Sequence, residues 1–220
     1  MYYQDHDDEV EVAVAPQLSP RAGDQDLTAK ARIRNAALDL YASQGEDRTS
    51  MRAIAAAAGV TVGLLVHHYG TKDRIRDAVE DLVVDYFRQA IARAPAGGSP
   101  ADIAAARDAA VAEMLVANPE VVNYMRRALL DPAGPRGHLL ERLTELSSAE
   151  VSQLRRSGLA SVKRAESSQV IGVMIRQLGH LFLQPMLDAM WQQLAGPAAS
   201  GTRKPILEVR VQTPGPPPGH

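Results

Sequence analysis

The sequence predicts an all-α protein, with a three-helix N-terminal domain followed by a larger helical domain. Alanine, the best helix former, accounts for 35 of the 220 residues. Aromatic residues, which favour strands, make up only 4%. Apolar residues recur at the three- and four-residue spacing of amphipathic helices through most of the chain. A chain of this length, 45% of it hydrophobic, can bury a core without disulfides or metals.

Three short helices are expected first, each starting at a hydroxyl residue and ending at a glycine. These residue types are the usual N-caps and C-terminal stops of helices. Thr28, either Thr49 or Ser50, and Thr61 are the candidate caps. The expected helices run over 28–45, 49–59 and 61–70.

Longer helices follow, for about nine in all. Thr71 caps the first of them, while Ser99-Pro100 and Asn118-Pro119 place a proline at the first helical position. The expected ranges are 71–94, 99–117, 118–130, 139–158 and 166–194. Pro185 should kink or break the last of these helices.

Composition divides the chain into four parts. Residues 1–26 read as an acidic, disordered tail with a net charge of −6, and residues 27–76 as a helical domain with a net charge of +4. A larger helical domain is expected over 77–195. Residues 196–220 are rich in Gly and Pro and read as an exposed tail around a short strand-like stretch, ILEVRV.

Several protein classes are excluded. The chain has no cysteine, which rules out disulfides, cysteine zinc sites and thiol nucleophiles. It shows neither a signal peptide nor a run of about 18 apolar residues, so we expect a cytoplasmic protein with no membrane span. No catalytic motif, glycine-rich phosphate loop or EF-hand occurs, so we expect no enzyme activity, no cofactor and no metal.

The functional motif is the helix–turn–helix pattern of residues 51–70, MRAIAAAAGVTVGLLVHHYG. In this arrangement the second helix lies in the major groove of DNA. Ala55 and Ala58 let the helices approach closely, and Gly59 lets the backbone turn. Short side chains at the start of the next helix can reach base edges, and hydroxyl groups at helix starts can bind phosphates.

These residues resemble the N-terminal domain of the TetR family of transcriptional regulators over about 28–78. The resemblance rests on residues of two stretches: Ile33, Ala36, Ala37, Leu38, Leu40, Tyr41 and Gly45; then Ile54, Ala55, Ala58, Gly59, Val60, Thr61, Gly63, Leu65, His68, Tyr69, Lys72, Asp73 and Ile75. It implies that residues 61–64 face the bases, that His68 and Lys72 lie near phosphates and that Tyr69 is a core aromatic. Val66 departs from the family, which usually has a DNA-contacting tyrosine there, so that contact is either lost or passed to His67.

The expected DNA-contact set combines the motif and the resemblance. Val62 and Leu64 favour apolar contact, for example with thymine methyl groups. A metal site at His67 and His68 is not expected, since neighbouring side chains point to different sides of a helix; packing or surface roles remain the alternative. The set is Thr49, Ser50, Arg52, Thr61, Val62, Gly63, Leu64, His67, His68 and Lys72.

The resemblance also implies that residues 27–76 are the DNA-binding domain and residues 77–195 the regulatory and dimerisation domain. It further implies a homodimer that binds a palindromic double-stranded operator and releases it when a small molecule binds. The pocket should fall among residues 82–130 and 170–183, and the dimer surface among helices of 139–194. Relatives usually end in a further helix, which this chain replaces by TRKPILEVRVQTPGPPPGH. The candidate ligand contacts are Tyr86, Tyr124, Met125, Met174, Gln177 and His180.

Alternatives stay open at several residues. His180 fits a packed core histidine better than a ligand contact. Arg176 and Gln177 could bind a ligand or lie at the dimer surface. Arg126 and Arg127 fit a solvated edge better than an acid-binding site. The alternative function is a helical protein that binds a small molecule or a partner and has lost specific DNA binding.

Overall fold

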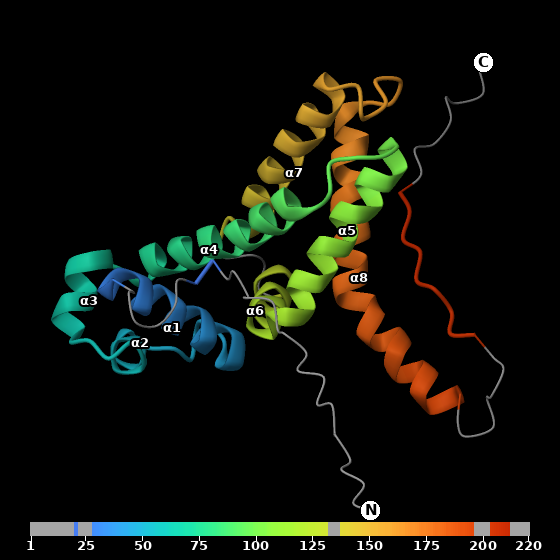
Figure 1. The fold of residues 1–220 in the computed structure, drawn as a ribbon. Coiled ribbons are helices and arrows are strands. Elements are labelled where there is room, and N and C mark those ends of the chain that lie inside the picture. Colours follow the sequence, from blue (N-terminus) through green and yellow to red (C-terminus); the bar gives the residue numbers. More distant parts are fainter. Residues whose placement is uncertain (1–19, 22–27, 132–136, 196–202, 212–220) are drawn as a thin grey trace, which may run out of the picture.

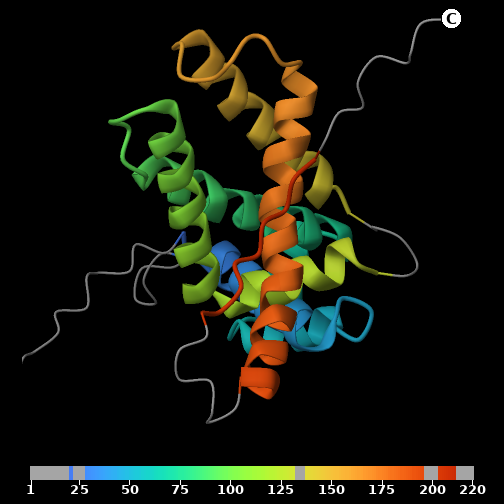
Figure 2. The same ribbon diagram turned by 90° about the vertical axis from the view of Figure 1, so that its right-hand side faces the viewer.

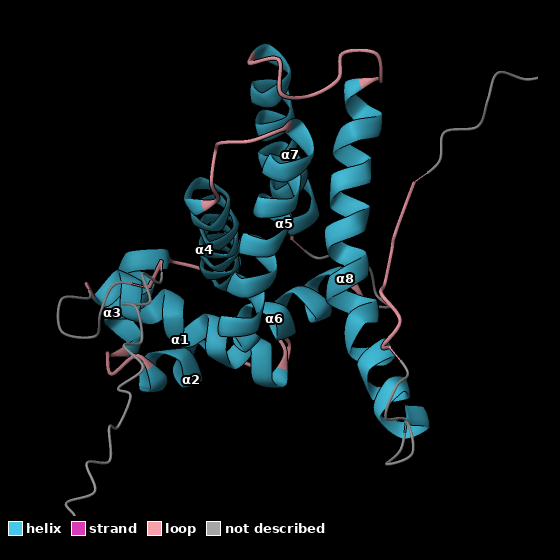
Figure 3. Ribbon diagram, turned by 45° about the vertical axis from the view of Figure 1, so that its right-hand side comes forward, coloured by secondary structure: helices cyan, strands magenta, loops and turns pink. Residues whose placement is uncertain are grey.

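The computed structural model describes residues 20–21, 28–131, 137–195 and 203–211, and within them it confirms the all-α prediction. These residues form eight helices: α1 (Ala29–Gln44), α2 (Met51–Ala57), α3 (Val62–Tyr69), α4 (Lys72–Arg93), α5 (Pro100–Ala117), α6 (Pro119–Leu129), α7 (Leu139–Arg156) and α8 (Glu166–Ala195). The expected count of nine was one too high for this part of the chain, because α8 continues through Pro185. The helix changes direction along its length instead of ending (Figures 1 and 3).

The first four helices begin as predicted, at hydroxyl side chains. Thr28, Ser50, Thr61 and Thr71 each accept a hydrogen bond from the backbone N–H three residues further on, at 3.1–3.3 Å. Such a cap satisfies one of the N–H groups that a helix start leaves unpaired. Gly70 ends α3 with a φ of +73°, a backbone conformation that glycine adopts without strain.

Helices α1–α3 lie at one end of the molecule, and α4 runs from them into the helical body (Figure 1). The core is continuous across this junction, since α1 packs against α6 and the Tyr41 ring stacks on Tyr124 with centroids 6.3 Å apart. Fully buried aliphatic side chains, each contributing about 1.5–3 kcal/mol, include Ile33, Leu38, Ile54, Leu65, Ile75 and Leu82. The N-terminal helices are therefore packed onto the body rather than tethered to it.

Helix α8 packs against α7 on one side and exposes apolar side chains on another. The exposed residues include Ile171, Ile175, Leu183, Met186 and Met190. Residues Glu166–Leu194, of mean hydropathy 1.2, are long and apolar enough for a membrane span, so the expectation that no segment suits one was too strict. Core helices of soluble proteins can be equally long and apolar, but they are mostly buried. Only 17% of the most apolar 18-residue stretch of this helix is buried.

Both expected tails are described only in part. The acidic segment 1–26 lies outside the described residues except for 20–21, where Arg21 pairs with Asp39 of α1 at 2.8 Å and with Glu120 of α6 at 3.5 Å. Residues 203–211, which include the strand-like stretch, form no strand and run extended beside α8 (Figure 2).

Candidate nucleic-acid interface and effector cavity

Helices α2 and α3 form the helix–turn–helix expected from the sequence. The two helices are bent by 106° across a short turn. Gly59 lies in that turn at a φ of +64°, where a side chain would strain the backbone. Ala55 and Ala58 are buried between the helices, as their small size requires. The turn therefore fixes the direction of α3 relative to α2.

Helix α3 buries one side and exposes the other. Leu65 and Tyr69 enter the core. On the opposite side, Val62, Leu64 and Val66 are 42%, 37% and 47% exposed, and Gly63 lies beside them. A cluster of exposed aliphatic side chains is typical of a contact surface. The first turn of α3 thus offers short apolar side chains to a partner.

Two hydroxyl groups lie at the starts of these helices. The Ser50 and Thr61 oxygens accept hydrogen bonds from the backbone of Ala53 and Leu64, each at 3.1 Å. Both residues are exposed, and each hydroxyl keeps its own proton to donate. Together with the N–H groups of the helix starts, they can bind phosphate oxygens.

Thr49 does not reach this surface. It is 1% exposed, its hydroxyl donates to the Gly45 carbonyl at 2.7 Å, and its oxygen accepts from Gln44 at 3.1 Å. Thr49 therefore holds the loop between α1 and α2, and the structure removes it from the expected contact set. Thr49 and Ser50 fit the cap pattern equally well, so the sequence could not separate them.

Lys72 and Tyr69 tie α3 and α4 to their surroundings. The Lys72 ammonium is half-buried and donates to the Glu46 carbonyl at 2.5 Å, which leaves two of its protons for other acceptors. The Tyr69 hydroxyl donates to the Lys30 carbonyl at 2.8 Å, and burial raises the pKa of this hydroxyl. Tyr69 thus fills the core position implied by the resemblance.

Some of the arginines in this region form no ion pair within the described residues, and others do. Arg32, Arg52 and Arg74 are exposed and pair with no other described residue, whereas Arg76 pairs with Glu46 and Asp73. His67 is exposed and His68 half-exposed, with ring centroids 5.5 Å apart. The described residues contain no group of three metal-ligating side chains around them.

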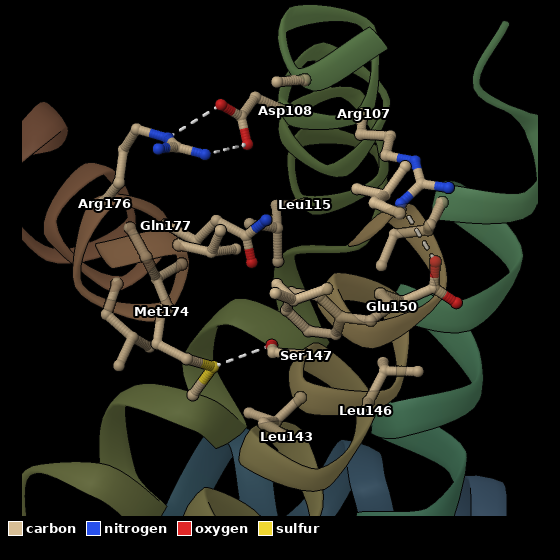
Figure 4. A pocket seen from close by; sticks show the side chains of 18 of the residues that line it. Arg107, Asp108, Leu115, Leu143, Leu146, Ser147, Glu150, Met174, Arg176 and Gln177 are labelled. Atoms are coloured by element: carbon tan, nitrogen blue, oxygen red, sulfur yellow. Dashed lines mark hydrogen bonds and ion pairs between the residues drawn. The ribbon is translucent and has the colours of Figure 1, made fainter. Parts of the chain in front are cut away.

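A second site lies in the body, between α4, α5, α6, α7 and α8. It is an apolar cavity of about 90 Å³, whose lining includes Met125, Leu143, Leu146 and Met174. Ion pairs cross its rim, Arg107 to Glu150 at 3.1 Å and Arg176 to Asp108 at 2.8 Å (Figure 4). The Ser147 hydroxyl contacts the Met174 sulfur at 3.1 Å.

A larger cavity of about 630 Å³ opens between α5, α6 and α8. It shares Asp108, Leu115, Arg176, Gln177 and Leu181 with the inner cavity. The Arg176–Asp108 ion pair therefore lies at the boundary between the two cavities. Both of its side chains are 35% exposed, so the pair can open without the full cost of a buried charge.

The residues expected to contact a ligand do not all line one cavity. Met125 and Met174 line the inner cavity, Gln177 lines both, and His180 lines the outer one. Tyr86 is buried and lines neither cavity. Tyr124 lines a separate polar cavity of about 440 Å³ between α1, α4, α6 and α7.

One expectation for a single residue was wrong, because His180 is exposed on α8 and is not a packed core histidine. Arg127 is exposed, as expected of a solvated edge, but both arginines also bond to other helices. Arg126 donates to the Leu181 carbonyl at 3.1 Å, and Arg127 to the Ala42 and Ser43 carbonyls at 3.0 and 2.9 Å. Arg127 thereby satisfies unpaired carbonyl groups at the end of α1.

A buried carboxylate also joins the two parts of the molecule. Glu80 of α4 is 1% exposed, accepts from the His138 N–H at 3.0 Å and pairs with Arg142 of α7 at 3.3 Å. Burial raises its pKa, against the opposing effects of the His138 hydrogen bond and the Arg142 charge. A movement of α7 would therefore displace α4 through these contacts, and α4 starts directly after α3.

Sequence reasoning missed the α7 wall of the inner cavity and its ion pairs. Asp108 and Glu150 look like any other acidic residue on an amphipathic helix, and nothing near them in sequence marks Arg176 or Arg107 as a partner. The only available signal was the presence of Arg176 and Gln177 in an apolar stretch.

Comparison with known proteins agrees with this architecture. Residues 33–79 match the model of the family described as bacterial regulatory proteins, tetR family. The chain is 43% identical over 75 residues to the HTH-type transcriptional regulatory protein RaaS of Mycobacterium tuberculosis, covering 34% of this chain and 35% of that protein. It is 41% identical over 73 residues to the HTH-type transcriptional repressor Rv3405c of the same organism, covering 33% and 37%. The match thus spans about a third of the length of these relatives.

The fold likeness extends further along the chain. The crystal structure of a tetR family transcription regulator from Shewanella sp. PV-4 aligns with a TM-score of 0.59 and 23% identity. The alignment covers 79% of this chain and 94% of that one. The helical body therefore has the same fold as that regulator, at an identity too low to carry more than the fold.

Proposed function

Because this chain belongs to the TetR family through its N-terminal domain, we propose that it is a transcriptional regulator that binds operator DNA. The observation that carries the proposal is the exposed face of α3, where Val62, Gly63 and Leu64 follow the Thr61 cap. Short side chains at the start of a recognition helix can approach base edges in the major groove. Ser50, Arg52, His67, His68 and Lys72 would contact phosphates around them.

The proposed DNA-binding unit is a homodimer on a palindromic operator. The exposed apolar side chains of α8 support it, because a helix face of this kind needs a partner to cover it. Two copies would place their α3 helices in successive major grooves, about 34–36 Å apart or a multiple of that spacing.

The proposed response is release of DNA when a small molecule enters the cavities of the body, which makes the protein a repressor. The lining favours a largely apolar molecule that can hydrogen-bond to Gln177 or His180. Its entry would move α8 or α7 relative to α6 and α4, and the Arg127 and Glu80 contacts would carry that movement to α1 and α4. A ligand acts in this way only if it binds the two arrangements unequally.

The alternative is a helical ligand-binding protein without an operator. Val66 supports it, since an exposed valine donates no hydrogen bond at a position where the family usually has tyrosine. The cavities would then be the functional part of the molecule.

Selection of bound duplexes from a random DNA library separates these functions. The dimeric regulator enriches a palindrome, and Thr61→Ala combined with Lys72→Gln abolishes the enrichment. Thr49→Ser, which keeps the buried hydroxyl, is the matched control and should enrich the same palindrome. Enrichment of no sequence by the folded protein would rule out the operator-binding function and leave the alternative.

A further inference from the structure

Residues 203–211 form an extended segment that packs on α8. Val209 approaches Gly179 so closely that a Cβ atom at position 179 would lie 2.7 Å from the valine Cγ2. Lys204 pairs with Asp188 at 2.6 Å, and this contact lowers the pKa of the Asp188 carboxyl. The segment therefore runs antiparallel to α8, as Figure 2 also shows.

The spacing of these two contacts fits an extended chain. Five residues separate Lys204 from Val209, which is about 16 Å of extended backbone. Nine residues separate Gly179 from Asp188, which is about 13.5 Å of helix. Nine residues at 100° each also place Asp188 on the side of α8 opposite Gly179, so the segment crosses the helix between its two anchor points.

Side chains of residues 206–210 alternate in the way that a half-covered strand requires. Leu207 and Val209 are half-buried, whereas Ile206 is 91% exposed. Glu208 and Arg210 are exposed and pair with each other. Since side chains of an extended chain alternate in direction, one edge of the segment faces α8 and the other faces solvent.

The Val209 end of the segment lies on the apolar face that the proposed dimer uses. At 100° per residue, five α8 positions fall within about 80° of one another: Ile175, Gly179, Leu183, Met186 and Met190. The four with side chains are 42–59% exposed even with the segment in place. Gly179, the contact of Val209, lies in the middle of this face, so a second copy cannot pack there while Val209 occupies it.

We propose that residues 203–211 compete in cis with a second copy of this chain for the outward face of α8, and so set how tightly the protein dimerises. This inference rests on the proposed function, in which the α8 face forms the dimer. If the segment covers α8 for nine-tenths of the time, about one chain in ten is competent to pair. Because both copies must uncover the face, the apparent dimer affinity falls about a hundredfold.

Sedimentation equilibrium of full-length variants tests the competition. Val209→Asp disrupts the docked edge of the segment without altering α8, and it should tighten dimerisation by about a hundredfold. Ile206→Asp is the matched control, because Ile206 points to solvent, and it should leave the dimer dissociation constant unchanged. An unchanged or weaker dimer in Val209→Asp would overturn the inference.

A second substitution tells this failure apart from failure of the proposed dimer. Ile175→Asp, introduced into the Val209→Asp chain, places a charge in the α8 face and should abolish dimerisation. A dimer that survives Ile175→Asp is formed by another surface, and this result would overturn both the dimer proposed for α8 and the competition.

Discussion

The N-terminal helices and the helical body differ in how far apart in the sequence the residues that hold the helix starts lie. Helices α1–α4 each begin at a hydroxyl residue that accepts from an N–H three residues away. In the body, Ser99 caps α5 locally, but α6 and α7 have no side-chain cap, and the start of α7 is held by Glu80, 58 residues earlier in the chain. The starts of the N-terminal helices are thus specified locally, whereas the start of α7 depends on a distant partner.

Truncation of a core residue in α3 should give the largest effect. Leu65 is fully buried, so Leu65→Ala loses its packing and leaves a cavity, which costs about 2–5 kcal/mol of unfolding free energy. Its neighbour Val66 is 47% exposed, and Val66→Ala should cost no more than about 0.5 kcal/mol. Urea unfolding monitored by circular dichroism measures both. Equal losses of unfolding free energy in the two variants would show that α3 does not bury the side that carries Leu65.

Glu80 should make the stability of the junction depend on pH. Its pKa is raised above the ordinary 4.5, so the folded protein holds the proton more tightly than the unfolded chain. The stability that Glu80 contributes is therefore complete below about pH 4.5 and is lost as the pH rises through the raised value, by at most about 1.4 kcal/mol per pH unit.

Urea unfolding at a series of pH values should show this loss in the wild-type protein and not in Glu80→Gln. The difference between the two proteins isolates Glu80 from the other titrating groups. A Glu80→Gln variant with the same pH dependence as wild type would contradict the assignment.

Loss of a local cap should have a smaller effect. Thr61→Ala removes the hydrogen bond to the Leu64 N–H and should cost about 1 kcal/mol. Thr61→Ser keeps the hydroxyl and should be close to wild type, with thermal unfolding as the measurement. If alanine and serine behave alike, the hydroxyl does not stabilise α3.

The ion pair between the two cavities should contribute least. Arg176 and Asp108 are both partly exposed, so a double-mutant cycle with Arg176→Ala and Asp108→Ala should give a coupling energy of about 0.2–1 kcal/mol. A coupling of several kcal/mol would mean that the pair is a rigid part of the core and not an opening between cavities.

The sequence predicts features that neighbouring residues determine, and it does not predict contacts between residues far apart in the chain. Caps, glycine stops and the inward side of α3 are decided within a few residues, and the structure agrees with most of them. Of the two candidates left open for α2, Ser50 is the cap, and Asn118 forms no side-chain cap bond at the start of α6. The role of Arg127 depends on carbonyl groups 84 and 85 residues away, and that of Asp108 on Arg176. Such pairings follow from the packing of helices, which periodicity does not encode.

We propose that the surface around the first turn of α3 binds DNA. The most direct test is the affinity for the selected duplex over a range of salt concentrations, for wild type, Lys72→Gln and Arg156→Ala. Lys72→Gln removes the positive charge next to α3, whereas Arg156 is exposed at the far end of α7. We predict a linear fall of log affinity with log salt, with a slope smaller by about one in Lys72→Gln and unchanged in Arg156→Ala. An unchanged slope in Lys72→Gln, or equal slopes in both variants, would contradict the account.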